Sequence, residues 1–178
     1  MLAFGSLSVF DRKAMNPCVC GHYGSGLQEC TCSPQQIHKY MGKISGPLLD
    51  RIDIHVDVPA VKYNELSTTR AGETSRSIRD RVNKARERQT KRFEGRKGFY
   101  CNADMETKEI KEFCGIDDAG AELLKMAMTK LGLSARAYDR ILKVSRSIAD
   151  LAGSESISSP HLSEAIQYRS LDRNFYAS

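Results

Sequence analysis

The chain has 178 residues, enough for one domain with a buried core or for one small domain and part of another. Its 28% charged and 40% hydrophobic residues are typical of an ordinary globular domain, and the net charge of +5 permits nucleic-acid binding without requiring it. No apolar run approaches the roughly 18 residues of a membrane span, and residues 1–10 lack the features of a signal peptide. We therefore predict a cytoplasmic protein that makes no membrane contact.

Residues 1–13 show no interpretable pattern, and the first candidate site residue is Asn16, which lies between Met15 and Pro17. Asparagine before proline is common in turns, where it needs no chemical role. On this pattern alone, Asn16 is predicted to be a turn residue.

Four cysteines follow in a Cys-x-Cys, nine-residue gap, Cys-x-Cys arrangement. They are Cys18, Cys20, Cys30 and Cys32. Four thiolates within fifteen residues can complete a tetrahedral metal site, and the three glycines between them permit the tight loop that such a site needs. Because protein ligands would fill every position, we predict a structural zinc site. Free or redox-active thiols are the alternative, and His22 or His38 could replace a cysteine as ligand.

A helix capped by Ser33, with apolar residues at helical spacing up to Ile44, leads into a second, shorter helix. Ser45 can cap this one-turn helix, which has Pro47 in its first turn. Strict alternation of apolar and polar residues then predicts a half-buried strand over Ile52–Val58.

The junction between the one-turn helix and the predicted strand holds Arg51 at a defined place. The leucines before it and the isoleucine after it are needed for packing, so its guanidinium is expected to point away from the core. The alternative is a surface arginine paired with Asp50 or Asp53.

Residues 60–72 are polar and are predicted to link two domains, after which residues 73–94 form a long helix. Its narrow packing stripe consists of Ile78, Val82, Ala85, Gln89 and Phe93. The remaining surface is basic, with Arg76, Arg79, Arg81, Lys84, Arg86, Arg88, Lys91 and Arg92 against Asp80 and Glu87. A one-sided basic helix can bind the phosphate backbone of DNA without reading its sequence. A solvated helix surface is the alternative.

Further helices are predicted to follow the long basic helix, including one that begins at Ser134 and ends at Gly153. Arg136 lies in the first turn of that helix, where a helix N-terminus and a guanidinium together favour a phosphate group. A surface arginine is again the alternative.

Three segments together resemble a known family. Leu-Leu-Asp-Arg-Ile-Asp at residues 48–53 resembles the arginine-finger segment of helix-2-insert AAA+ ATPases. With Ala-Met-Asn-Pro-Cys at residues 14–18 and the helix at 134–151, the chain is most similar to the magnesium-chelatase-related ComM/YifB family of bacterial competence proteins. The resemblance covers roughly residues 14–173. It implies that Arg51 is a catalytic arginine finger, Asn16 a catalytic sensor 1 residue and Arg136 a nucleotide-binding sensor 2 residue.

The family implies a hexameric ring that uses ATP and magnesium to remodel DNA, specifically by branch migration during natural transformation. The expected fold is mainly α: residues 1–59 form the C-terminal remnant of an AAA+ α/β core with the cysteine-rich loop, and residues 73–178 form an all-helical lid. The chain departs from the family at residues 9–13, which do not reproduce a buried strand, and at Val19, where proline is usual.

The chain contains neither a Walker A sequence nor an apolar strand ending in Asp-Glu, and Ile44 follows Gly42-Lys43 where a phosphate loop needs a hydroxyl residue. We therefore expect no ATP hydrolysis by this chain alone. Two functions compete: the C-terminal portion of a ComM-like AAA+ ATPase and helicase, and a free-standing zinc-containing helical module that binds DNA or another partner.

Overall fold

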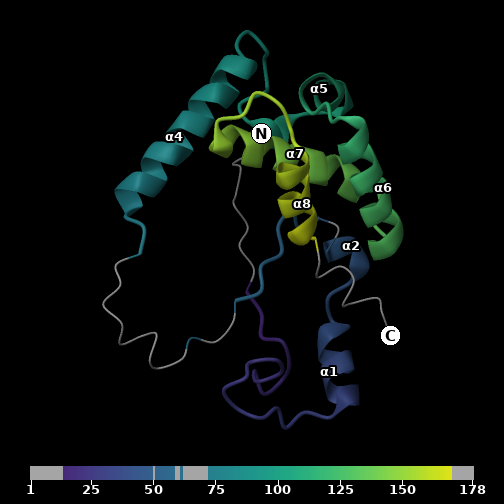
Figure 1. Cartoon of the computed structure of the whole chain (residues 1–178). Helices are drawn as coiled ribbons and strands as arrows, with labels where there is room; N and C mark the ends of the chain where they lie inside the picture. Colours follow the sequence, from purple (N-terminus) through teal and green to yellow (C-terminus); the bar gives the residue numbers. More distant parts are fainter. Residues whose placement is uncertain (1–13, 50, 59–60, 62–71, 170–178) are drawn as a thin grey trace, which may run out of the picture. The chain divides into compact units, whose positions relative to one another are not determined.

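The computed structural model in Figure 1 describes residues 14–49, 51–58, 61 and 72–169. Seven α-helices, one 3-10 turn and no β-strand occur among the described residues. These residues form two compact units: 14–43 with 61, and 44–58 together with 72–169. The predicted mainly α fold is confirmed for the described residues, and none of their helices is long and apolar enough to cross a membrane.

The first unit contains the cysteine loop and α1 (Pro34–Met41), which begins where the sequence predicts. The Ser33 hydroxyl accepts a hydrogen bond from the Gln36 amide at 3.2 Å, and the Gln36 side chain accepts one from the Ser33 amide at 2.9 Å. This reciprocal capping satisfies two amide groups that the helix cannot pair itself. No residue of α1 is fully buried, so local caps contribute more to this helix than a core does.

The second unit begins with the predicted one-turn helix, α2 (Gly46–Leu49). The Ser45 carbonyl accepts hydrogen bonds from the amides of Leu48 and Leu49, at 3.0 and 3.1 Å. Leu49 is buried, with 5% of its surface exposed, and anchors the segment that carries Arg51.

The prediction of a strand after α2 is wrong for the described residues. Residues 52–58 do not pair with another strand. Ile54, Val56 and Val58 are 48%, 62% and 80% exposed, so the apolar side of the predicted alternation lies uncovered. A strand requires a neighbouring strand to pair its backbone groups, and the described residues supply none. The amide of His55 instead donates to the Tyr168 carbonyl at 2.8 Å, just beyond α8 (Ser159–Gln167).

The rest of the second unit is a bundle of helices, which is called the lid below (Figure 1). It comprises α4 (Ser75–Arg92), the 3-10 turn Asn102–Asp104, α5 (Thr107–Phe113), α6 (Asp118–Leu131), α7 (Ala135–Ala152) and α8. Side chains of Thr74, Asp117 and Ser134 cap the starts of α4, α6 and α7. Gly132 and Gly153 end α6 and α7 in the left-handed conformation that glycine adopts most easily.

The centre of the lid is α7, which packs against α4, α5 and α8, while α6 also packs against α8. Its inward side includes Ile141, Leu142 and Ala149, which are at most 3% exposed. Leu124 from α6 and Leu162 from α8 complete this core with 1% and 0% exposure. Burial of such apolar side chains provides most of the free energy that holds the helices together.

The packing stripe predicted for α4 is correct only in its C-terminal half. Ala85, Gln89 and Phe93 are buried, whereas Ile78 and Val82 are each 42% exposed. Figure 1 shows that the N-terminal half of α4 extends away from α7, so no described helix covers it. The basic helix is therefore anchored at one end and accessible to solvent over the other.

A buried ionic network fixes the C-terminal end of α4 to α7. The Arg92 guanidinium donates to both carboxylate oxygens of Asp150, at 2.7 and 2.5 Å, and to the Asn102 side chain at 2.7 Å. Arg146 approaches the same carboxylate to 3.2 Å, and the Asp150 side chain has no exposed surface. Because an unpaired buried charge is strongly destabilising, this network restricts how α4 can be oriented on the lid.

The contacts group residues 44–58 with the lid, whereas the predicted domain boundary lies later, at residues 60–72. Apart from Val61 and Gly72, that linker lies outside the described residues. The division into residues 1–59 and 73–178 therefore stays a prediction.

Candidate functional site

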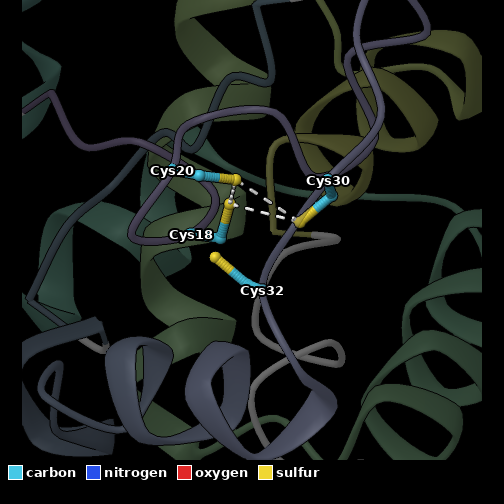
Figure 2. Close-up of side chains that lie close together, drawn as sticks. All are labelled: Cys18, Cys20, Cys30 and Cys32. Carbon is cyan, nitrogen blue, oxygen red and sulfur yellow. Dashed lines mark hydrogen bonds between the residues drawn. The ribbon is translucent and has the colours of Figure 1, made fainter.

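The four cysteines of the loop bring their sulfur atoms together at one point, as Figure 2 shows. The Cys18 sulfur lies 3.4 Å from that of Cys20 and 3.7 Å from that of Cys30, and the sulfurs of Cys20 and Cys30 are 3.6 Å apart. All four sulfurs, including that of Cys32, lie within 4.8 Å of one another. The cysteines are reduced, so no disulfide accounts for these distances.

The sulfur geometry matches a tetrahedral thiolate site. Four sulfurs placed about 2.3 Å from a central ion would be about 3.8 Å apart. The three distances among Cys18, Cys20 and Cys30 are close to this value, and the Cys32 sulfur lies within 4.8 Å of each of them. The group contains four cysteines and no histidine among the described residues, so the alternative with His22 or His38 as a ligand finds no support. These four residues can hold a metal ion with every coordination position filled by protein.

The loop backbone permits this convergence. The Gly21 amide donates to the Cys18 carbonyl at 3.2 Å, which folds the chain between the first two cysteines. Gly21 has φ of 84°, a conformation that a residue with a side chain rarely adopts. The side chain of Asn16 lies beside this turn. A β-carbon placed on Gly21 would be 3.7 Å from the side-chain amide nitrogen of Asn16.

The thiols differ in their affinity for protons. Backbone amides of His22 and Thr31 lower the pKa of Cys20 to about 5 because they stabilise its thiolate. The Cys32 amide acts in the same direction on Cys30, but burial and the neighbouring sulfurs outweigh it and raise the pKa of Cys30 to about 12. Negative charges this close together repel one another, and a bound cation would relieve that repulsion.

Arg51 is exposed, and the lid fixes the backbone on which it lies. Arg140 of α7 donates to the Arg51 carbonyl at 2.9 Å and forms an ion pair with Asp53. Arg169, which is 1% exposed, donates to the Ile52 carbonyl. Asp53 therefore pairs with Arg140 and not with Arg51. The Arg51 side chain lies at the surface.

The side chains of the other candidate residues, Asn16, Arg51 and Arg136, are all exposed. Arg136 is exposed in the first turn of α7. The Ser134 hydroxyl caps this turn by accepting a hydrogen bond from the Ala137 amide at 3.2 Å. Asn16 is exposed in the first unit, whereas both arginines belong to the second. The structure thus brings the four cysteines together, and the roles predicted for Asn16, Arg51 and Arg136 stay predictions.

The basic helix α4 borders a cleft of about 620 Å³ together with the last turn of α7. Its cationic lining comprises Arg76, Arg81, Lys84 and Arg88. Arg81 makes two hydrogen bonds to Glu73, at 2.9 and 3.1 Å, and Arg88 contacts Glu155 at 3.4 Å. Arg76 and Lys84 make no ion pair with the described residues, so this cleft carries accessible positive charge.

Two family models match the chain in succession. Residues 10–66 match the model described as magnesium chelatase, subunit ChlI, which covers the cysteine loop and the Arg51 segment. Residues 72–169, more than half of the chain, match the model described as magnesium chelatase, subunit ChlI C-terminal. The chain belongs to the magnesium chelatase ChlI C-terminal family.

Relatives of this chain include a bacterial competence protein. The chain is 48% identical over 161 residues to the competence protein ComM of Haemophilus influenzae. It is 42% and 40% identical over the same length to the uncharacterized proteins YifB of Escherichia coli and Salmonella typhimurium. Each alignment covers 90% of this chain and 30% of the relative, so the chain spans about a third of the length of these proteins. The predicted resemblance to the ComM/YifB family is confirmed.

Sequence reasoning in this magnesium-chelatase-like chain missed two arginines. No motif or spacing in the sequence singles out either Arg140 or Arg169. Both reach residues more than eighty positions earlier, with separations of 87 residues for Arg140 and Asp53 and 117 for Arg169 and Ile52. Contacts across such separations leave no local pattern that a single sequence could reveal.

Proposed function

We propose that this chain is the C-terminal portion of a ComM-like AAA+ ATPase and helicase that acts in DNA branch migration and natural transformation. Its similarity to the competence protein ComM along 90% of its length carries this proposal. Residues 1–59 then belong to the end of the ATPase core, and the helical lid of residues 73–178 follows. In an assembled hexameric ring, the chain supplies residues that act on ATP and magnesium held largely by other parts of the protein.

Within that ring, Arg51 is the arginine finger that stabilises the charge on the transferred phosphoryl group. Support comes from its exposed side chain on a backbone segment that Arg140 and Arg169 hold against the lid. Asn16 orients the attacking water, and Arg136 contacts the nucleotide from the start of α7. A guanidinium beside a helix N-terminus suits that role because both attract phosphate.

The cysteine loop binds zinc as a structural ion. Four cysteine ligands match the preference of zinc for thiolates, and their sulfur atoms lie close enough together to share one ion. Zinc bound there would neutralise the thiolates and close the loop between Cys18 and Cys32. A site with four protein ligands has no open position for substrate, so its role is to hold the loop in shape.

DNA binds along α4 through its phosphate backbone. The helix carries eight basic side chains against two acidic ones, and its N-terminal half is uncovered in the described structure. Each phosphate contact by lysine or arginine releases counterions, so affinity is expected to fall steeply with salt and to change little with DNA sequence.

A second candidate function is a free-standing zinc-containing DNA-binding module without ATPase activity. The observation that favours it is that both the cysteine cluster and the basic helix are complete within this chain. Genomic sequence upstream of the chain separates the two functions, since a Walker A motif in frame there identifies the ATPase and its absence supports the module.

DNA binding is tested by reversing charges in the cleft beside α4. The triple variant Arg81→Glu, Lys84→Glu and Arg88→Glu is expected to lose binding to a labelled duplex in fluorescence anisotropy. A matched variant, Lys108→Glu, Lys125→Glu and Lys130→Glu, makes the same charge change on α5 and α6 and is expected to lose far less. Equal losses in the two variants would assign the effect to net charge and remove the site from α4.

The catalytic proposal is tested with magnesium and ATP, measuring turnover and nucleotide binding separately. The chain alone is expected to show no turnover because phosphoryl transfer needs a phosphate-binding loop and bound metal before an arginine finger can act. Hydrolysis that disappears on Arg51→Ala would instead show a complete phosphate site within these residues.

A further inference from the structure

The cysteine loop contains two neighbouring thiols that solvent can reach. Cys20 and Cys30 are each partly exposed, and their sulfur atoms lie 3.6 Å apart. The Cys18 sulfur is close to both, at 3.4 and 3.7 Å, but Cys18 has no exposed surface. Of the three thiol pairs joined by dashed lines in Figure 2, only Cys20 and Cys30 are both accessible to a small oxidant.

Little packing resists a movement of these two cysteines toward each other. Among residues 18–32, Cys18 alone is buried. Tyr23 and Leu27, which lie between Cys20 and Cys30 in the sequence, are 53% and 50% exposed. A segment with so few buried contacts can adjust its backbone at low cost, so the two sulfurs can come into bonding distance.

The other two thiols of the chain lack this arrangement. The Cys101 sulfur donates to the Asp104 carboxylate at 3.3 Å, and Cys114 is only 3% exposed. Neither belongs to the group of four cysteines. An oxidised thiol becomes a disulfide only where a second thiol lies beside it, so disulfide formation is directed to the loop.

We propose that the cysteine loop is a peroxide-sensitive modification site at which Cys20 and Cys30 form a disulfide. Hydrogen peroxide oxidises the first thiol to a sulfenic acid, as the O–O bond breaks and one water leaves. The second sulfur then attacks the sulfenic sulfur, an S–S bond replaces the S–O bond, and a second water leaves. In total, two thiols and one peroxide give one disulfide and two waters, and two electrons pass from sulfur to peroxide.

The disulfide releases the metal ion proposed for this loop. Zinc binds thiolates, and sulfur atoms bonded to each other are no longer thiolates. Only Cys18 and Cys32 would remain as ligands, and two thiolates do not complete a structural site. This consequence rests on the proposed zinc site, whereas the disulfide rests on the positions and exposure of the two thiols.

The test treats the reduced full chain with hydrogen peroxide, blocks the remaining thiols by alkylation and locates the disulfide by mass spectrometry. Trypsin and Glu-C together release residues 14–29 and 30–39 as two peptides, each with two cysteines. The two peptides are expected to stay joined after oxidation and to separate when dithiothreitol is added. Free zinc, measured with a colorimetric chelator, is expected to rise in step with the joined peptides.

Serine variants test which two sulfurs are joined. Cys20→Ser and Cys30→Ser are expected to lose most of the joined product, whereas Cys32→Ser keeps it, although all three variants lose zinc. Cys101→Ser, outside the loop, is the matched control and is expected to behave like the parent in both measurements. Equal amounts of joined product in Cys20→Ser and Cys32→Ser would overturn the proposed pairing.

The outcomes separate this modification site from the zinc proposal. Joined peptides from a parent protein that carries no zinc would leave the disulfide standing and remove the metal site. Added glutathione shows when enough peroxide is present to oxidise a thiol. If the glutathione is oxidised while the two peptides stay apart or only gain oxygen atoms, the disulfide is wrong, and zinc retained in that sample leaves the metal site standing.

Discussion

Residues 18–32 converge on four sulfur atoms, whereas residues 72–169 surround a buried apolar core. The cysteine loop has one fully buried side chain, Cys18, and the adjoining α1 has none. The lid buries side chains from five helices and adds the ionic network around Asp150. This contrast teaches that the loop has little packing to hold its shape, whereas packing and ion pairs hold the lid. Disturbing one should leave the other intact.

The largest effect is expected at the cysteine cluster. Cys30→Ser should reduce bound zinc from about one ion per chain to almost none, because a structural site needs all of its thiolates. Elemental analysis of purified protein measures this, and Cys101→Ser, which lies outside the cluster, is the matched control. The thermal unfolding of the lid is expected to be unchanged. Folded parent protein free of zinc would refute the metal site.

The next effect concerns the ionic network of the lid. Asp150→Ala leaves the partly buried Arg92 and the buried Arg146 without their carboxylate, and the free energy of unfolding is expected to fall by about 3–5 kcal/mol. Urea denaturation followed by circular dichroism measures the change. Glu155→Ala removes a 97% exposed partner of Arg88 and should have almost no effect. Zinc content should stay that of the parent, and its loss would show that the two regions depend on each other.

The smallest effect is expected where the lid holds the Arg51 segment. Arg140→Ala removes an ion pair whose Asp53 side chain is 53% exposed, so the segment should lose only about 0.2–1 kcal/mol of local stability. Hydrogen exchange at the His55 amide, which donates to Tyr168, reports this loosening. Arg136→Ala, one turn earlier on α7, should leave exchange unchanged. Similar exchange in the parent and Arg140→Ala would mean that other contacts are sufficient to hold the segment.

Much of the lid could be predicted because its signals are local. Capping residues such as Ser134 and terminating glycines such as Gly153 mark helix ends within one turn, so α7 was expected where it occurs. The strand at 52–58 was predicted from alternation alone and is absent from the described structure. Alternation identifies side chains that could share a face, but a strand also needs a partner whose presence the local pattern does not encode.

The candidate sites divide in the same way. The spacing of four cysteines and three glycines was enough to predict a compact metal-binding loop, since all of the ligands lie within fifteen residues. The importance of Arg140 and Arg169 could not be predicted, because their partners in residues 51–53 are distant in sequence. The position of Tyr100 beside α4 likewise depends on how the turn after α4 folds back.

By itself, the sequence determined the helices, their ends, the cysteine cluster and the family, because caps, periodicity and short ligand spacings act over a few residues. Only the tertiary structure decided which half of α4 is buried, which arginines hold the Arg51 segment and which apolar residues stay exposed. The physical reason is that burial and long-range ion pairs depend on which helices meet: Arg92 at the end of α4 pairs with Asp150 of α7, while Ile78 and Val82 earlier on α4 stay 42% exposed.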